Sequence, residues 1–267
     1  MRSAARAITT AVILLAPYTV ASASSTSMDR IALTGNGSTL TGTSGGGGGS
    51  FTWLHNFDAN SLLTLGAEHQ KLSVARWSFG SVSGALTREL GSGRYNFSAE
   101  AHEGSGQDGV HPLGYHIEAA GVTGTYFHRL SMLLEYRRID VETTHGHLPK
   151  VGLAYLWSPH WLTTISYQQS AGGNLGTRLT SLRVDRYSPV VNVLVGGSYG
   201  QASPTIIALG IVSPGHILRE GYLGVSKTIA RRTDVSLTGD YINLSGSKQA
   251  KVTLGFIVRL GSLGANH

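Results

Sequence analysis

The sequence predicts an all-β fold, a transmembrane antiparallel up-and-down β-barrel of about 14 strands. Charged residues make up 13% of the 267-residue chain, against about 25% in typical soluble domains. After the N-terminal segment, no run is apolar over the roughly 20 residues that a membrane-crossing helix needs. Alternating apolar and polar residues recur roughly every 15 to 20 residues, which is typical of strands.

The N-terminal segment predicts a cleaved signal peptide over residues 1–23. Arg2 and Arg6 form its basic start, and Ala7 to Ala16 form its apolar core. Ala21-Ser22-Ala23 is the A-x-A cleavage site. A membrane anchor is the alternative, but the apolar run is too short for a spanning helix, and Pro17 interrupts it. We therefore expect one barrel domain at 24–260 and a C-terminal tail at 261–267. The chain has no cysteine, which excludes disulfides and thiolate metal sites.

Two segments show the alternation most clearly. In Lys251 to Leu260, every second residue from Val252 onward is apolar. The segment Arg94 to Glu103 has five polar residues on one face, which cannot all lie in a dry core: Arg94, Asn96, Ser98, Glu100 and His102. A soluble β-sandwich or lipocalin-like barrel would show the same pattern turned inside out. Strands of about ten residues, many hairpins and aromatic residues near turns favour the membrane barrel. These aromatic residues are Phe127, Trp157, Trp161, Tyr167 and Tyr187.

Tight turns and longer loops alternate along the chain, as they do in membrane barrels. The expected periplasmic turns lie near Asp58-Ala59-Asn60, Gly91-Ser92-Gly93, His128-Arg129-Leu130, Ser158-Pro159-His160, Tyr187-Ser188-Pro189 and Arg231-Arg232-Thr233. The expected outer loops are Thr43–Gly49, Gln70–Ser73, Gly104–Gly114, Thr144–Pro149, Ala171–Leu175, Gln201–Arg219 and Ser245–Gln249. This parity gives about fourteen strands with both ends on the periplasmic side. The apolar Thr205 to Val212 is assigned to a loop folded inward or over the mouth, and twelve strands after a disordered leader is the alternative.

Charged and polar residues that alternate with apolar neighbours are expected to line the lumen. They are Arg94, Glu100, His102, Glu135, Arg137, Arg183, Asp185, Asp240, Lys251 and Arg259. Both signs are present, so two interpretations stay open. The charges either pair across the lumen and plug it, or line a hydrated pore with weak ionic preference. About fourteen strands favour a pore, since about eight strands leave an interior that side chains fill.

Other constellations give no expectation of an active site, a cofactor or a metal. Ser98, Glu100 and His102 share a face, but their roughly 7 Å steps are too long for a direct proton relay. The histidines in or near outer loops lack a third ligand at a defined spacing, and they are His111, His116, His145 and His147. Two Gly-rich segments, at 104–109 and from Thr34, are interpreted as turns because neither precedes a helix. The basic residues are scattered, which argues against nucleic-acid binding.

Strands such as Arg76-Trp77-Ser78-Phe79-Gly80 and Glu220-Gly221-Tyr222-Leu223-Gly224-Val225-Ser226, together with the signal peptide and short turns, resemble those of the YaiO-like outer-membrane β-barrel family. The resemblance covers most of residues 28–260 as a pattern. It implies location and fold, and related barrels accompany exopolysaccharide export systems. The chain departs from such barrels at its end, because the last strand reaches Leu260 without a final aromatic residue.

The expected function is passive passage of polar solutes through a hydrated pore, with saccharide or exopolysaccharide export as the specific hypothesis. A structural or docking barrel of a secretion assembly and an outer-membrane lipid hydrolase are the alternatives. The expected partners are outer-membrane lipid, the barrel assembly machinery, and polysaccharide or secretion components.

Overall fold

The computed structural model describes residues 28–40, 45–71, 75–108, 111–126, 129–141, 144–202, 216–244 and 247–260. These residues form fourteen strands: β1 Met28–Leu40, β2 Gly46–Asn56, β3 Ser61–Lys71, β4 Ala75–Leu90, β5 Gly93–Asp108, β6 His111–Tyr126, β7 Leu130–Val141, β8 Thr144–Ser158, β9 Trp161–Gln169, β10 Arg178–Arg186, β11 Asn192–Ala202, β12 His216–Ala230, β13 Thr233–Leu244 and β14 Ser247–Leu260. The predicted signal peptide, the C-terminal tail and Thr205 to Val212 lie outside the described residues.

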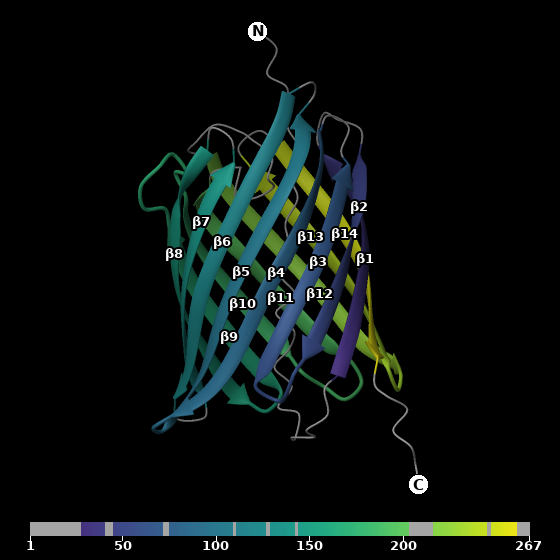
Figure 1. Ribbon diagram of the computed structural model, residues 1–267, viewed down its shortest axis with the longest axis vertical. Coiled ribbons are helices and arrows are strands. Elements are labelled where there is room, and N and C mark those ends of the chain that lie inside the picture. The colour runs from purple at the N-terminus through teal and green to yellow at the C-terminus, as the bar shows by residue number, and fades with distance from the viewer. Residues whose placement is uncertain are drawn as a thin grey trace.

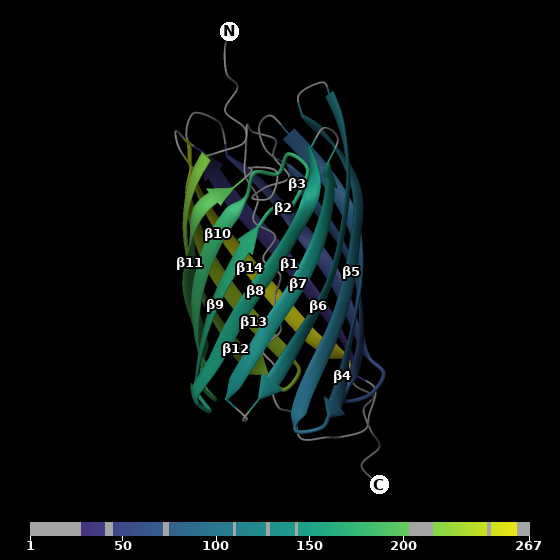
Figure 2. The same ribbon diagram turned by 90° about the vertical axis from the view of Figure 1, so that its left-hand side faces the viewer.

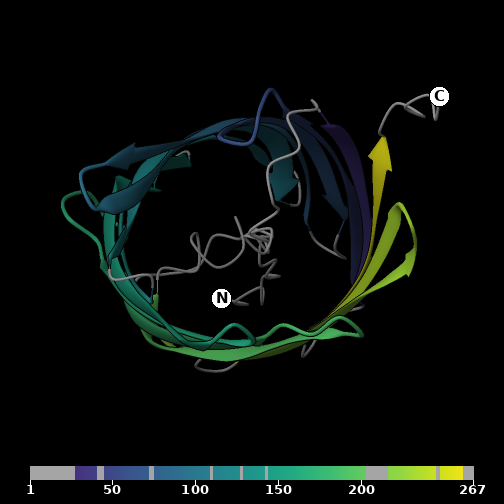
Figure 3. The same cartoon turned by 90° about the horizontal axis from the view of Figure 1, so that it is seen from below.

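The strands form one closed antiparallel barrel in which each strand pairs with its sequence neighbours. The ring closes where β1 pairs with β14, in a register that runs from Asp29 opposite Leu260 to Leu40 opposite Gln249. Each described strand is therefore paired on both sides, and none is an edge strand. The prediction of fourteen strands with both ends on one side is therefore confirmed, and the twelve-strand alternative is wrong (Figure 1, Figure 3).

The outer surface of the barrel is apolar. On β14, Val252, Leu254 and Phe256 are exposed, whereas Lys251 and Gly255 on the alternate positions are buried. Exposed leucine, valine and aromatic side chains recur in the same way on the other strands. In the part of the chain that the structure describes, no helix is long and apolar enough to cross a membrane. A closed ring with such a surface satisfies its backbone hydrogen bonds internally and can face lipid.

The two ends of the barrel differ. Short turns connect strands at the end that carries Met28 and Leu260, which we call the turn end, and the opposite end is called the loop end. At the turn end, the Asp58 carboxylate accepts hydrogen bonds from the Asn60 amide and the Ser61 hydroxyl, both at 2.7 Å. Because short turns are periplasmic in bacterial barrels, the loop end faces the outside of the cell.

Several predicted loops are shorter than the sequence suggested. Most of Gly104–Gly114 belongs to β5 and β6, and all of Thr144–Pro149 belongs to β8. The Gly-rich segment from Thr34 continues β1 to Leu40 instead of forming a turn. The other predicted outer loops also lose one or more terminal residues to the adjacent strands, except Ala171–Leu175. Pairing beyond the apolar band needs only backbone groups, so strands continue there without apolar alternation.

The rim at the loop end slopes around the barrel. Strands β4, β5 and β6 each contain 16 residues, whereas β9 and β10 each contain 9. Consequently β8 extends beyond β9, and residues 170–177, the β9–β10 loop, cover its free edge (Figure 2). Two amides of the loop donate to β8 carbonyls, Ala171 to His147 at 2.8 Å and Asn174 to His145 at 3.0 Å.

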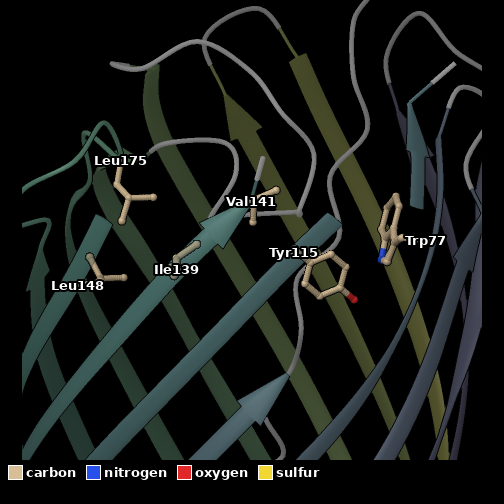
Figure 4. Packing of buried hydrophobic residues seen from close by; sticks show 6 residues of the cluster. All are labelled: Trp77, Tyr115, Ile139, Val141, Leu148 and Leu175. Atoms are coloured by element: carbon tan, nitrogen blue, oxygen red, sulfur yellow. The ribbon is translucent and has the colours of Figure 1, made fainter. Parts of the chain in front are cut away.

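An apolar cluster lies inside the barrel near the loop end (Figure 4). Trp77, Tyr115, Ile139, Val141 and Leu148 come from neighbouring strands, and Leu175 of the β9–β10 loop packs against them. Leu175 is fully buried, so the cluster ties the loop to the wall.

The aromatic girdle is only partly as expected. Trp157 and Trp161 are exposed near the turn end, as a girdle requires, and Arg186 lies over the Trp161 ring at 5.8 Å. Tyr187 is half-buried and adjoins the inner charges of β10, so its assignment to the girdle is wrong. Phe127 lies outside the described residues.

Candidate functional site: the inner wall of the barrel

The structure places all ten predicted lumen residues on the inner face of the strands. Cross-strand register fixes these positions, because directly paired residues point to the same side of a sheet. Glu100 on β5 and Arg137 on β7, for example, both pair with Ala119 on β6. Their outward neighbours on the strands, such as Tyr136, are exposed on the lipid side.

Four of these residues, joined by Lys150, form one network across β5 to β8. Arg137 Nη2 donates to Glu100 Oε1 at 2.9 Å and lies 3.4 Å from Glu135 Oε1. Lys150 Nζ lies 3.7 Å from Glu135 Oε2, and His102 Nε2 lies 3.7 Å from Glu100 Oε2. Each carboxylate thus faces at least one cation on its own side of the barrel.

A second pair lies on β10. Arg183 Nε donates to both carboxylate oxygens of Asp185 at 2.9 Å. Gly196 on β11 lies between Arg183 on β10 and Tyr222 on β12. A Cβ at Gly196 would lie 2.4 Å from the Tyr222 hydroxyl, so glycine lets the tyrosine lie flat across the inner wall toward β10.

The remaining predicted residues lie near the seam and the turn end. Asp240 on β13 is directly opposite Lys251 on β14. Arg259 Nη2 donates to Asp234 Oδ2. Arg94 is exposed beside the turn between β4 and β5, opposite Glu89. All these pairs run along the wall, within one strand or between adjacent or next-adjacent strands.

Sequence reasoning missed several charged residues of the inner face. They are Arg30, Glu68, Glu89, Lys150, Glu220 and Asp234. Their position in the two-residue alternation of each strand was the available signal, since each except Glu220 follows or precedes an apolar outward residue. With them, the inner-face residues whose side chains the structure describes include seven Lys or Arg and eight Asp or Glu, and their charge is close to balanced.

The charges of the β5–β8 network are only partly buried, whereas Asp185, Asp240 and Lys251 are buried. The Glu100, Glu135 and Arg137 side chains each keep 22% exposure, and Lys150 keeps 26%. Ion pairs that retain this much access to water lie next to solvated space rather than in a dry core. The wall can therefore hold water and polar solutes against a surface of alternating sign.

The candidate catalytic and metal-binding groups are not assembled. Ser98 and His102 share the inner face with Glu100, and His102 Nε2 lies 3.7 Å from Glu100 Oε2, beyond hydrogen-bond distance. His116 lies between Glu103 and Glu118 on the outer face, and His147 contacts the Tyr136 hydroxyl at 2.6 Å. Within the described ranges, no three His, Asp or Glu side chains are placed to hold a metal ion.

Comparison with known proteins adds evidence on the fold. No protein-family model and no curated protein matches the sequence. Among solved structures, the CymD monoaromatic hydrocarbon channel matches with a TM-score of 0.60 and 10% identity, over 90% of this chain and 89% of that one. The protein has the fold of an outer-membrane β-barrel.

Two further structures support this fold. The TodX deltaS2S3 mutant monoaromatic hydrocarbon channel matches with a TM-score of 0.58 and 8% identity, over 89% of this chain and 91% of that one. The Acinetobacter baumannii outer membrane protein Omp33 matches with a TM-score of 0.53 and 9% identity, over 87% and 99%. The barrel with its lipid-facing surface places the chain in a bacterial outer membrane.

Proposed function

We propose that this outer-membrane barrel forms a hydrated pore for passive passage of polar solutes. The observation that carries the proposal is the half-buried network of Glu100, Glu135, Arg137 and Lys150, whose ion pairs run along the wall instead of across the ring. A ring of fourteen strands is wider than the eight-stranded barrels whose side chains fill the interior.

The balance of inner charges favours neutral polar solutes over ions of either sign. Such a solute gains hydrogen bonds to paired charges without meeting a net field. Saccharides have this chemistry, so we propose a saccharide, including exopolysaccharide, as the transported class. We also propose that the protein belongs to the YaiO-like barrels and acts with export partners. The pattern of strands and turns in the sequence supports this assignment. CymD and TodX are monoaromatic hydrocarbon channels, which supports passage rather than catalysis.

Planar bilayers test the pore directly. We expect stepwise conductance from purified protein, with little preference between cations and anions. Arg94→Glu places a negative charge on the inner face at the turn end and should shift selectivity toward cations. The matched control is Arg88→Glu on the outer face of the adjacent strand end, which should leave selectivity unchanged.

Two results would contradict the proposal. An absence of conductance from folded protein would overturn the pore and favour a docking barrel of a secretion assembly. Equal selectivity shifts in the two variants would show that the ions do not move along the inner face of the barrel. Swelling of protein-containing liposomes in neutral oligosaccharides then tests the solute class, and swelling only in small ions would remove saccharides.

A further inference from the structure

A pair of like charges lies on the outer face of the barrel at the loop end. Lys71 at the end of β3 is directly opposite Arg76 at the start of β4. Both side chains are exposed, and Gly47, the neighbour of Lys71 on β2, adds no side chain. Like charges directly opposite each other destabilise a strand pair. An anion bound between them would remove that repulsion.

Hydrogen bonds fix the position of the Arg76 side chain. Its Nε and Nη2 donate to the side-chain oxygen Oε1 of Gln107 on β5 at 3.0 and 2.7 Å. These bonds fix the guanidinium on the outer face, between β4 and β5. Lys71 and Arg76 therefore present two positive charges from adjacent strands next to the outer leaflet of the membrane.

A groove of about 710 Å³ begins directly below this cation pair. Its outward-pointing lining is small or polar, and includes Gly49, Ala67, His69, Ser78, Gly80 and Ser105. His69 and Ser78 form the first row under the cations, joined by a 2.8 Å hydrogen bond. Ala67 and Gly80 form the second row.

Larger side chains border the groove. Phe51 lies beside Ala67, and Leu65 with Val82 continues the column toward the middle of the barrel. These three side chains are exposed to lipid. Glu103, the acidic residue of the lining that points outward, contacts His116 on the far side at 2.6 Å. The groove is thus cationic at the loop end of the barrel and apolar toward the middle of the membrane.

We propose that this groove binds a phosphorylated, acylated lipid of the outer leaflet. The lipid phosphate lies between Lys71 and Arg76, and one acyl chain follows Ser78, Gly80 and Val82 into the hydrocarbon region. Basic residues beside a membrane-spanning segment attract anionic headgroups, and small residues leave room for a chain. The assignment does not depend on the pore, because it concerns the opposite face of the sheet.

Native mass spectrometry of detergent-purified protein with bis-phosphorylated lipid A tests the proposal. Lys71→Gln combined with Arg76→Gln should weaken binding at least about tenfold, because two charge-assisted contacts are lost. Arg178→Gln combined with Arg219→Gln removes two cations elsewhere on the same rim and should leave most of the binding intact. Equal weakening in both double variants would overturn the site.

The groove itself has a matched pair of variants. A Cβ at Gly80 meets only the Gly66 carbonyl at 3.8 Å, and one at Gly84 meets only the Leu62 carbonyl at 3.7 Å. Gly80→Leu fills the groove and should reduce lipid binding, whereas Gly84→Leu on the same face of β4 lies outside it and should not. Both variants are compatible with folding.

Three outcomes would overturn the lipid as occupant. Dephosphorylated lipid A that binds as tightly as the phosphorylated form would remove the role of the cations. Competition by inorganic phosphate at the same concentration as the lipid would show an anion site without the acyl chain. A dimer of wild-type protein that Gly80→Leu dissociates would assign the groove to a second copy of the chain.

Discussion

Arg137 on β7 reaches over β6 to hydrogen-bond Glu100 on β5, and the residue that it passes is Ala119. The two partners are separated by one whole strand, so their direct contact depends on a small side chain in the row between them. Alanine at this position lets the ion pair lie flat on the wall instead of projecting into the lumen.

Replacing Ala119 should therefore break the contact. Ala119→Leu inserts a branched side chain between Glu100 and Arg137, and we expect both to turn toward the lumen and conductance to fall. The control is Ala120→Leu on the outer face of the same strand, where an added apolar side chain meets lipid. Equal conductance in the two variants would contradict the prediction.

Removing Arg137, the cation shared by Glu100 and Glu135, should lower the free energy of unfolding. Arg137→Gln leaves Glu100 and Glu135 half-buried with less compensation, and we expect a loss of about 1–3 kcal/mol, below that of a fully buried pair because water reaches the site. Reversible urea unfolding in lipid vesicles measures it. Adding Glu100→Gln should recover part of the loss, and no recovery would mean that the arginine stabilises the wall through packing alone.

The β9–β10 loop gives a prediction based on two adjacent glycines. Gly172 and Gly173 both have positive φ, 70° and 67°. A Cβ at Gly173 would also lie 1.9 Å from the His145 carbonyl oxygen, whereas one at Gly172 approaches no atom closer than 3.9 Å. Gly173→Ala should release the loop from β8, and Gly172→Ala should cost only about 1 kcal/mol of backbone strain.

Amide hydrogen exchange reads out this difference. The Ala171 and Asn174 amides donate to β8 carbonyls, so we expect much faster exchange at both in Gly173→Ala than in Gly172→Ala. Similar rates in the two variants would show that the close approach to His145 does not hold the loop.

The Asp58 turn should loosen in acid. Hydrogen bonds from Ser61 and Asn60 lower the pKa of the Asp58 carboxyl below its ordinary value. A carboxylate with a lowered pKa stabilises the folded turn above the unfolded pKa, and this stabilisation is lost as pH falls through the folded pKa. Exchange of the Asn60 amide, corrected for intrinsic rates, should accelerate below about pH 4. Asp58→Asn should remove the pH dependence.

The fold was predictable because its signals are local. Turn residues such as Asp58 and Gly91, together with apolar alternation like that of Val252 to Leu260, determine strand number and parity without knowledge of the register. The strand ends near Asp108 and Thr144 were not predictable, because there both faces of the sheet are polar and the alternation stops.

The inner wall was predictable only as a list of residues. Alternation assigns Glu100 and Arg137 to one face, but 37 positions separate them, and their contact depends on the register of β6 between them. The groove below Lys71 was missed because its residues come from β2 to β5, and it is defined by missing side chains as much as by those present.

The sloping rim has a consequence for how a cell displays this protein. With a strand tilt of about 40°, the 16 residues of β5 span roughly 40 Å along the membrane normal, and the 9 residues of β9 span roughly 23 Å. The apolar band of such a barrel is about 25 Å tall. The β4–β6 side therefore projects above the headgroups while the β9–β10 side ends level with them (Figure 2). An antibody or a phage tail fibre that approaches the cell would meet the β5–β6 hairpin first, and selection by immunity or infection should fall on that hairpin.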